Sequence, residues 1–157
     1  MSDDSNHTTP ADQLLRQFAG YRMKRAFLVI QEDLAETLAP LGLRLGTYSV
    51  LAVVAANNGM SQSQLSDVLN IKRSGVVALI DELEAAGVLV RKPVAGDRRT
   101  NALALTPAGR RLWTRSEAAV KAHEARILHA LNDAEKEQLH DLLSRVAPPS
   151  DKGNRND

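Results

Sequence analysis

Apolar side chains recur every three or four residues along most of the chain, which is the spacing of a helix with one buried face. This spacing predicts a first helix from Ala11 to about Leu38, ending before Pro40. It predicts a second helix from about Gly46 to Ala56, and the segment TYSVLAVVAA within it is apolar on nearly every side. We therefore expect the second helix to be buried.

Two short helices joined by a tight turn are predicted next. Ser61 and Gln64 form a capping box, so a short helix begins there. A second one begins near Lys72 or Arg73 and stops at Gly87. In a helix-turn-helix, the first turns of the second helix enter the major groove of DNA. Two short helices and a turn are also common in all-α proteins, so this pattern leaves both interpretations open.

A β-hairpin is predicted directly after this motif. Two short runs, Val88 to Lys92 and Asn101 to Leu105, flank a turn that carries Gly96, Asp97, Arg98 and Arg99. A hairpin in this place brings cationic side chains against phosphates or into the minor groove. We expect Gly96 to supply the backbone angles of the turn and Asp97 to orient Arg99 by a charge-assisted hydrogen bond. A solvated hairpin whose charges only prevent edge pairing is the alternative.

Composition and charge narrow the function classes. The 157 residues are 43% apolar and 25% charged, as in a globular protein, and the absence of cysteine excludes disulfides and thiol redox sensing. The net charge is only +1, but residues 72–121 hold ten Lys/Arg against five Asp/Glu. This basic centre favours a phosphate-binding surface, with uneven solvated charge as the alternative. No apolar run approaches roughly 18 residues and the first ten residues are polar, so we expect no membrane span, no secretory signal and a cytoplasmic location.

Together these features resemble the MarR (multiple antibiotic resistance regulator) family of winged-helix transcription factors. The resemblance extends from about Ala11 to Val146, and LSDVLNIKRSGVVALIDELEAAGVLVRK and LNDAEKEQLHDLLSRV match the family's helix-turn-helix and final helix. Its most specific element is the family pattern Asp-x-Arg, five residues, then Leu-Thr-x-x-Gly, which corresponds to Asp97, Arg99, Leu105, Thr106 and Gly109. The resemblance implies a mostly α fold with a small β-hairpin wing, in which a winged helix-turn-helix is combined with N- and C-terminal dimerisation helices.

One departure from the family affects the expected reading surface. Members often carry a polar or basic side chain where this chain has Gly75, Val77 and Ala78. Arg73 and Ser74 are therefore the main candidates for polar base contacts, while Val77 and Ala78 suit thymine methyl groups. The predicted DNA-binding residues are Ser61, Gln62, Lys72, Arg73, Ser74, Val77, Ala78, Arg98 and Arg99, with Gly96 and Asp97 orienting the wing.

Two more helices are predicted after the hairpin. Thr106 caps a helix that has Pro107 in its first position and continues to Asn132, where Asn132 and Glu135 cap the last helix. The last helix has an apolar stripe formed by Leu139, Leu142, Leu143 and Val146. Pairing with a second chain around a two-fold axis would bury this stripe, and an intramolecular bundle is the alternative. The expected organisation is disordered tails at 1–10 and 148–157, dimerisation helices at 11–45 and 107–147, and the DNA-binding domain at 46–106.

A ligand pocket is a further expectation. The five aromatic residues lie outside the DNA-reading segment, on helices that in similar proteins border such a pocket, although core packing is the alternative role for each. The candidate pocket residues are Arg22, Phe27, Tyr48 and Trp113. They suit a small aromatic ligand whose carboxylate would meet one of four arginines, namely Arg16, Arg22, Arg25 or Arg44.

The sequence thus predicts a homodimeric, sequence-specific transcriptional repressor that binds an inverted-repeat operator in double-stranded DNA. A small molecule, such as an aromatic carboxylate, would release it. Metal-ligand histidine spacing, a phosphate-cradling loop and a nucleophile elbow are absent from the sequence, so we expect no enzyme activity, no metal and no cofactor. The alternatives are a winged-helix protein-interaction module without DNA binding and a small hydrolase with a scattered site.

Overall fold

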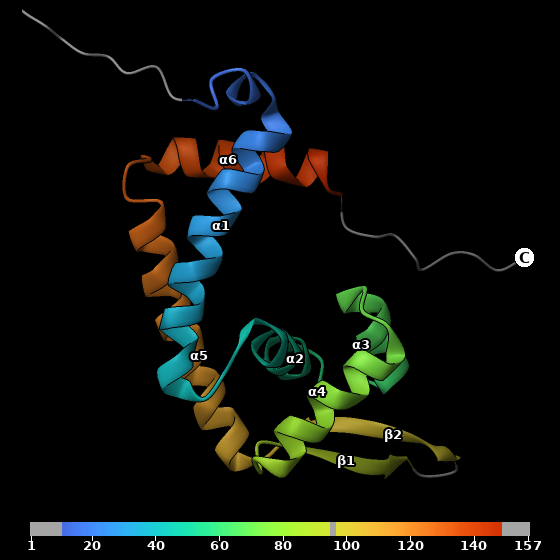
Figure 1. Ribbon diagram of the computed structural model, residues 1–157. Helices are drawn as coiled ribbons and strands as arrows, with labels where there is room; N and C mark the ends of the chain where they lie inside the picture. Colours follow the sequence, from blue (N-terminus) through green and yellow to red (C-terminus); the bar gives the residue numbers. More distant parts are fainter. Residues whose placement is uncertain (1–10, 95–96, 149–157) are drawn as a thin grey trace, which may run out of the picture. The chain divides into compact units, whose positions relative to one another are not determined.

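The computed structural model describes residues 11–94 and 97–148, with side chains for all of them except residues 97–100. They form helices and one two-stranded antiparallel sheet (Figure 1). The α-helices are α1 Ala19–Leu38, α2 Leu45–Ala56, α3 Gln62–Leu69, α4 Arg73–Ala85, α5 Pro107–Ile127 and α6 Asp133–Val146. The 3₁₀ helices are η1 Leu15–Gln17 and η2 Ala39–Leu41, and the strands are β1 Leu89–Val94 and β2 Asp97–Leu105. The predicted fold class, mostly α with one hairpin, is confirmed.

The first helix begins later than predicted. The continuous helix expected from Ala11 is divided into η1 and α1, because Phe18 between them is extended, with φ −93° and ψ 128°. The carboxylate of Asp12 accepts hydrogen bonds from Arg16 Nε at 2.7 Å and from the Tyr21 hydroxyl at 2.6 Å. Asp12 therefore ties η1 to the first turn of α1 across this break, an arrangement that one continuous helix does not allow.

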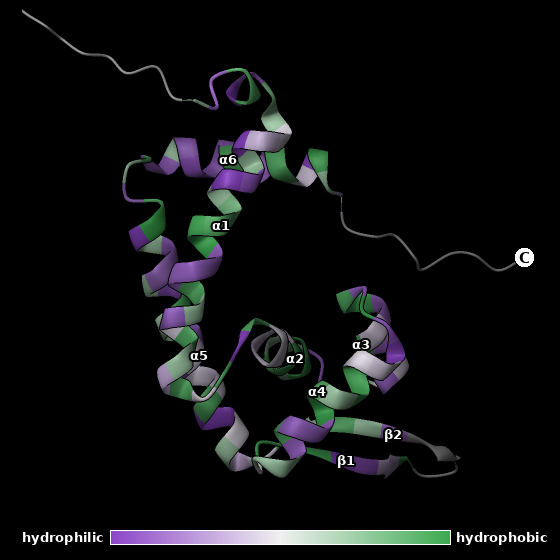
Figure 2. Cartoon of the chain, in the orientation of Figure 1, coloured by the Kyte–Doolittle hydropathy of each residue, from purple (hydrophilic) through white to green (hydrophobic). Residues whose placement is uncertain are grey.

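The hydrophobic core lies among α2, α3, α4 and the base of the hairpin, where Figure 2 shows hydrophobic residues along these elements. Seven of its side chains have 0% exposure: Leu38, Val50, Leu51, Leu65, Ile80, Leu89 and Leu103. The predicted burial of α2 is confirmed on the face formed by Thr47, Val50, Leu51 and Val54. The core therefore packs α3, α4 and the base of the hairpin against the same helix, α2.

The hairpin is longer than predicted. β1 continues to Val94 and β2 begins at Asp97, because Val94 pairs with Asp97 beyond a register shift at Pro93. The segment before α3 also pairs with β2. Gly59 N donates to the Leu103 carbonyl at 2.9 Å, and Leu103 N donates to the Met60 carbonyl at 2.8 Å. The base of β2 is therefore hydrogen-bonded on both of its edges.

Helix α5 begins as predicted and ends early. The Thr106 hydroxyl accepts a hydrogen bond from Gly109 N at 3.0 Å and donates one to the Gly87 carbonyl at 2.7 Å. A Cβ atom on Gly109 would lie 1.9 Å from the Val88 carbonyl oxygen, so only glycine permits this approach of α5 to the hairpin. The helix ends at Ile127 rather than near Asn132, because His129 N bonds to the Arg126 carbonyl with tight three-residue spacing.

The last helix begins with the predicted capping box. The Asn132 side chain accepts from Glu135 N at 3.0 Å, and Glu135 accepts from Asn132 N at 2.8 Å. No residue of α6 is buried, and its apolar residues Leu142 and Leu143 are each 45% exposed. The stripe predicted for this helix therefore lies at the surface of the single chain.

The chain divides into two compact units between Asp33 and Leu34. The boundaries expected at residues 45 and 106 are different, because they separate the dimerisation helices from the DNA-binding domain by function. That functional division remains a prediction. Among the described residues, no single helix is long and apolar enough to cross a membrane, and only the bent pair Ala19–Leu41 with Leu45–Ala56 meets that test jointly.

Candidate nucleic-acid interface

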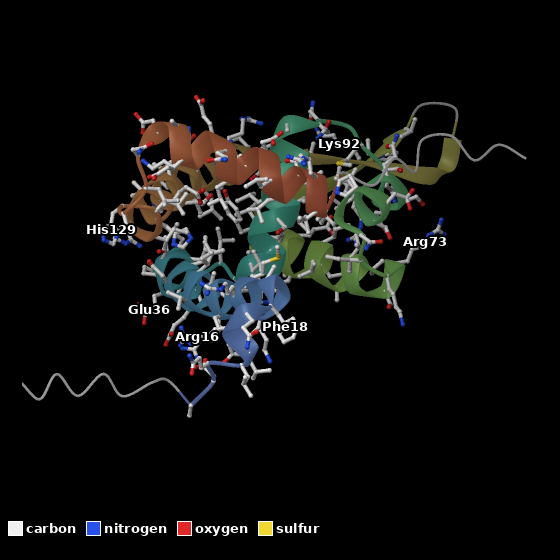
Figure 3. All side chains as sticks on the ribbon, turned by 90° about the horizontal axis from the view of Figure 1, so that it is seen from above. Arg16, Phe18, Glu36, Arg73, Lys92 and His129 are labelled. Atoms are coloured by element: carbon white, nitrogen blue, oxygen red, sulfur yellow. The ribbon has the colours of Figure 1, made fainter. Side chains whose placement is uncertain are left out.

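The first turns of α4 present one exposed face. Val76, Ile80 and Leu83 are buried against the core, which turns the opposite side of the helix outward. That side carries the exposed residues predicted to read DNA: Lys72, Arg73, Ser74, Val77 and Ala78. Figure 3 shows the Arg73 side chain extending away from the ribbon. The face therefore combines two cations, a hydroxyl and two small apolar groups, a set suited to phosphates, base edges and thymine methyls.

Helix α3 positions Arg73. Arg73 Nη2 donates to the Ser63 hydroxyl at 3.0 Å, a contact between two exposed side chains. Ser63 is not among the residues predicted to bind DNA, since nothing in the sequence signals which residue of α3 lies beside the start of α4. Ser61 has another engagement: its hydroxyl accepts from Gln64 N at 3.2 Å as the cap of α3. Gln62 is half-buried.

The turn between α3 and α4 is fixed by backbone geometry and one buried hydroxyl. Asn70 adopts a left-handed conformation with φ 52°, which asparagine tolerates better than most residues. The Ser66 hydroxyl donates to the Ile71 carbonyl at 2.6 Å. A Cβ atom on Gly75 would lie 3.0 Å from Ile71 Cγ2, so the glycine lets α4 start close to the turn. A larger side chain at this position would require Ile71 to shift by a few tenths of an ångström.

The wing residues require one correction. Asp97, Arg98 and Arg99 were predicted in the turn, but they form the beginning of β2, because the strand pairing resumes at Val94 and Asp97. The side chains of these three residues, and all of Gly96, lie outside the described residues. Their proposed contacts with DNA and the orientation of Arg99 by Asp97 remain predictions. Lys92, exposed on β1, adds positive charge to the described part of the hairpin (Figure 3).

Two arginines form ion pairs with the three carboxylates near the end of α4. Arg91 on β1 pairs with Asp81 at 2.5 Å and with Glu84, and Arg44 before α2 pairs with Glu82 at 2.5 Å. Partial burial lowers the pKa of Arg91, but its hydrogen bonds and ion pairs with the two carboxylates outweigh burial and hold that pKa above its ordinary value. Sequence analysis counted Arg91 only as part of a basic segment, because its partners lie seven and ten residues away on another element.

Two of the four predicted ligand-pocket residues lie together. The rings of Tyr48 and Trp113 stack with centroids 6.0 Å apart and an interplanar angle of 28°. Burial raises the pKa of the Tyr48 phenol. Phe27 is 53% exposed and Arg22 donates through Nε to the Arg16 carbonyl at 2.6 Å, and these residues belong to the other compact unit.

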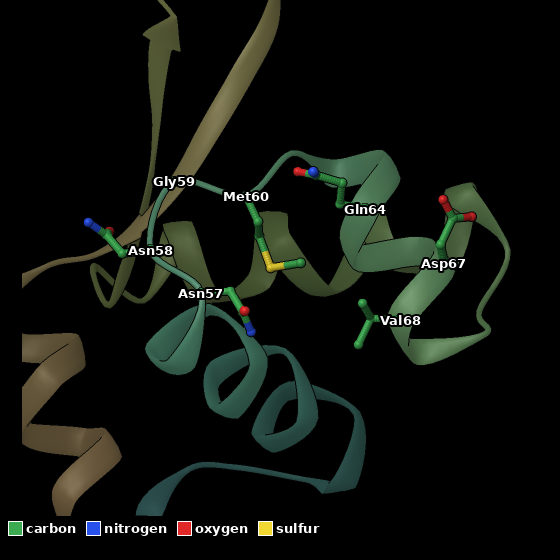
Figure 4. Close-up of a pocket in the computed structure, with 7 residues that line it drawn as sticks. All are labelled: Asn57, Asn58, Gly59, Met60, Gln64, Asp67 and Val68. Carbon is green, nitrogen blue, oxygen red and sulfur yellow. The ribbon is translucent and has the colours of Figure 1, made fainter. Parts of the chain in front are cut away.

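A surface cavity of about 570 Å³ lies elsewhere, between the end of α2 and α3 (Figure 4). None of the predicted ligand residues lines it. Its lining consists of Asn57, Asn58, Gly59, Met60, Gln64, Asp67 and Val68.

Comparison with known proteins places this geometry in a family. Residues 41–100 match the family model described as MarR family. The putative transcriptional regulatory protein for the hcr operon of Thauera aromatica is 34% identical, over 81% of this chain and 77% of its own length. Among solved structures, the transcriptional repressor CouR bound to a 23-mer DNA duplex has a TM-score of 0.82 at 34% identity, covering 87% of this chain and 96% of that one. CouR from Rhodococcus jostii RHA1 bound to p-coumaroyl-CoA has a TM-score of 0.76 at 30% identity, covering 87% and 96%.

Proposed function

The chain belongs to the MarR family of transcriptional regulators, and from that premise we propose that it is a homodimeric repressor that binds an inverted-repeat DNA operator and is released by a small aromatic ligand. The observation that carries DNA binding is the outward face of α4, where Arg73 is held by Ser63 opposite a fully packed core. This role involves no catalytic step, and its site of action is the chromosome in the cytoplasm.

The dimer is supported by α6. Its exposed apolar residues Leu142, Leu143 and Val146 form a surface that a second copy of the chain would bury. Two copies related by a two-fold axis would present two α4 helices to successive major-groove turns of an inverted repeat.

Binding to DNA from upstream of the protein's own gene, measured by fluorescence anisotropy at two salt concentrations, tests the DNA-binding proposal. We expect Arg73→Ala to relax base preference at one position per half-site by about 1–3 kcal/mol. Arg99→Ala should weaken binding to all sequences and reduce the salt slope by about 1. Lys121→Ala, which removes a 74% exposed cation from α5, is the matched charge control and should leave base preference intact.

If the wild-type chain did not distinguish operator from random DNA, the protein-interaction module would become the better interpretation. If Arg99→Ala left affinity and salt dependence unchanged, only the role of the wing would be wrong.

The ligand proposal is supported by the stacked Tyr48–Trp113 pair and by the CouR structure with p-coumaroyl-CoA. The chain has a single tryptophan, so a ligand near Trp113 should quench the intrinsic fluorescence and release the operator over the same concentration range. Aromatic acids and aromatic acyl thioesters are the two probe classes, with an aliphatic acyl thioester as the control. Hydrogen peroxide should have no prompt effect, because the chain lacks cysteine. Quenching without operator release would show a ligand site that does not control DNA binding.

A further inference from the structure

Arg91 connects the hairpin to the reading helix. It lies in β1, opposite Leu103 of β2, and its side chain is 20% exposed. Its two terminal nitrogens reach separate carboxylates, Asp81 at 2.5 Å and Glu84, which lie one helical turn apart on α4. Arg91 N also donates to Glu84 at 3.2 Å. Both the side chain and the backbone of this strand residue are therefore fixed to α4.

Only an arginine fits this arrangement. The planar guanidinium presents donors in a rigid fork, which allows one side chain to bridge two carboxylates in a defined direction. A lysine ammonium is a point charge on a flexible stem and gives no comparable orientation. Another ion pair of α4, Arg44 with Glu82, connects the same helix to the start of α2 and does not reach the hairpin.

Arg91 lies where β1 leaves the core, so its contact with α4 can set the direction of the strand beyond it. Beyond Arg91 the strand continues through Lys92 and Pro93 to Val94, and these three residues are exposed rather than packed on the core. At the base, β2 is held by its hydrogen bonds with Gly59 and Met60. Arg91 supplies the corresponding attachment for β1.

From these contacts we propose that Arg91 is a positioning residue that sets the direction of the wing relative to the reading helix α4, so that both meet DNA as one preformed surface. This inference rests on the proposed function, since it concerns how that DNA interface is held. Without the contacts of Arg91 with Asp81 and Glu84, the wing samples several directions. Its contacts with DNA then contribute less to affinity, because binding must also offset the conformational entropy lost when the wing becomes ordered. The contacts made by the exposed start of α4 are unchanged.

A double-mutant cycle of Arg91→Gln and Arg99→Ala tests the proposal, with operator affinity measured by anisotropy at one salt concentration. We expect Arg91→Gln to weaken binding of the wild type by about fivefold to tenfold and to weaken binding of Arg99→Ala by less than about twofold, because the wing contribution is already lost. Base preference at the position read by Arg73 should stay the same. Arg44→Gln is the matched control: it removes the same charge and an ion pair to the same helix, and its effect should be equal in both backgrounds.

Two further variants keep the test decisive. Asp81→Asn breaks only one of the two Arg91 ion pairs, at a 58% exposed carboxylate, so it should fold normally and show a smaller effect with the same non-additivity. Arg91→Lys keeps the charge and loses the fork, and should bind like Arg91→Gln. Full additivity of Arg91→Gln and Asp81→Asn with Arg99→Ala, or wild-type affinity of Arg91→Lys, would overturn the inference. A wild-type chain that does not bind the operator would instead overturn the proposed function.

Discussion

Helices α3 and α4, in the segment from Leu38 to Leu105, share an amphipathic pattern with helix α6 but differ from it in how far their apolar faces are buried. In the described part of the chain, all buried apolar side chains lie between Leu38 and Leu105, and helix α6 buries none. Hydrophobic periodicity therefore predicts that a helix face will be covered, but it does not state which chain covers it. The first segment buries its apolar side chains within the chain, whereas α6 leaves its stripe exposed, as the proposed dimer requires.

The largest test of this contrast is deletion of residues 132–157. Removing α6 should abolish specific operator binding and leave a chain that aggregates or sediments as a monomer, because the surfaces that α6 would cover in the proposed dimer become exposed. Deletion of residues 149–157, which lie outside the described residues, is the control and should leave assembly unchanged. Sedimentation and operator titration measure both. A folded dimer of the longer truncation with full operator affinity would break the comparison.

Two leucine substitutions test the contrast between the buried core and the exposed face of α6 at single residues. Leu65→Ala removes a side chain with 0% exposure and should lower the free energy of unfolding by about 2–5 kcal/mol at every protein concentration. Leu143→Ala removes a side chain that is 45% exposed in the single chain, so its cost should appear only through the dimer. Denaturant unfolding at several protein concentrations separates them, because only the dimer-dependent loss changes with concentration. Equal, concentration-independent losses would show that α6 packs within its own chain.

Two glycines provide a smaller test of the same kind. Gly109→Ala should destabilise the fold by about 1–3 kcal/mol, because the new Cβ would lie 1.9 Å from the Val88 carbonyl oxygen. Gly20→Ala in α1 meets nothing within 4 Å and should stabilise by about 0.5 kcal/mol through helix propensity. Thermal midpoints of both variants check the opposite signs, and a neutral Gly109→Ala would mean that the base of the hairpin is free to adjust.

The smallest effect is expected at Asp12. Hydrogen bonds from Arg16 and Tyr21 lower the pKa of this carboxyl from 3.8 to about 2. Its contribution to stability is therefore complete above pH 3.8 and is lost as the pH falls through about 2. The hydrogen bond between Asp12 and Tyr21 also raises the pKa of the Tyr21 phenol. Asp12→Asn should return the Tyr21 pKa toward its ordinary value without changing Tyr48, as tyrosinate absorbance would show. An unchanged titration would mean that the Asp12 contact is absent in solution.

Local chemistry explains which elements the sequence could predict. The capping boxes at Ser61 and Asn132 and the cap at Thr106 depend on residues within four positions of each other, and each begins a helix where predicted. The early end of α5 and the break at Phe18 depend on hydrogen bonds that compete with the helix, so periodicity alone missed them. The exposed face of α4 followed from its apolar spacing. The contacts Ser63–Arg73 and Arg91–Asp81 join different elements, and their geometry is set by tertiary packing.

The close approach at Gly109 also has a mechanical consequence. With no side chain between α5 and the Val88 carbonyl, the helix meets the start of the hairpin through direct backbone contact. Helix α5 has 21 residues, so at 1.5 Å per residue it is a rod about 31 Å long. Its far end, Ile127, lies 18 residues from Gly109, or about 27 Å, so a rotation of about 5° at Gly109 would move that end by about 2.4 Å. A small angle where α5 meets the hairpin would thus become a displacement of nearly half a helical turn at the other end of the helix.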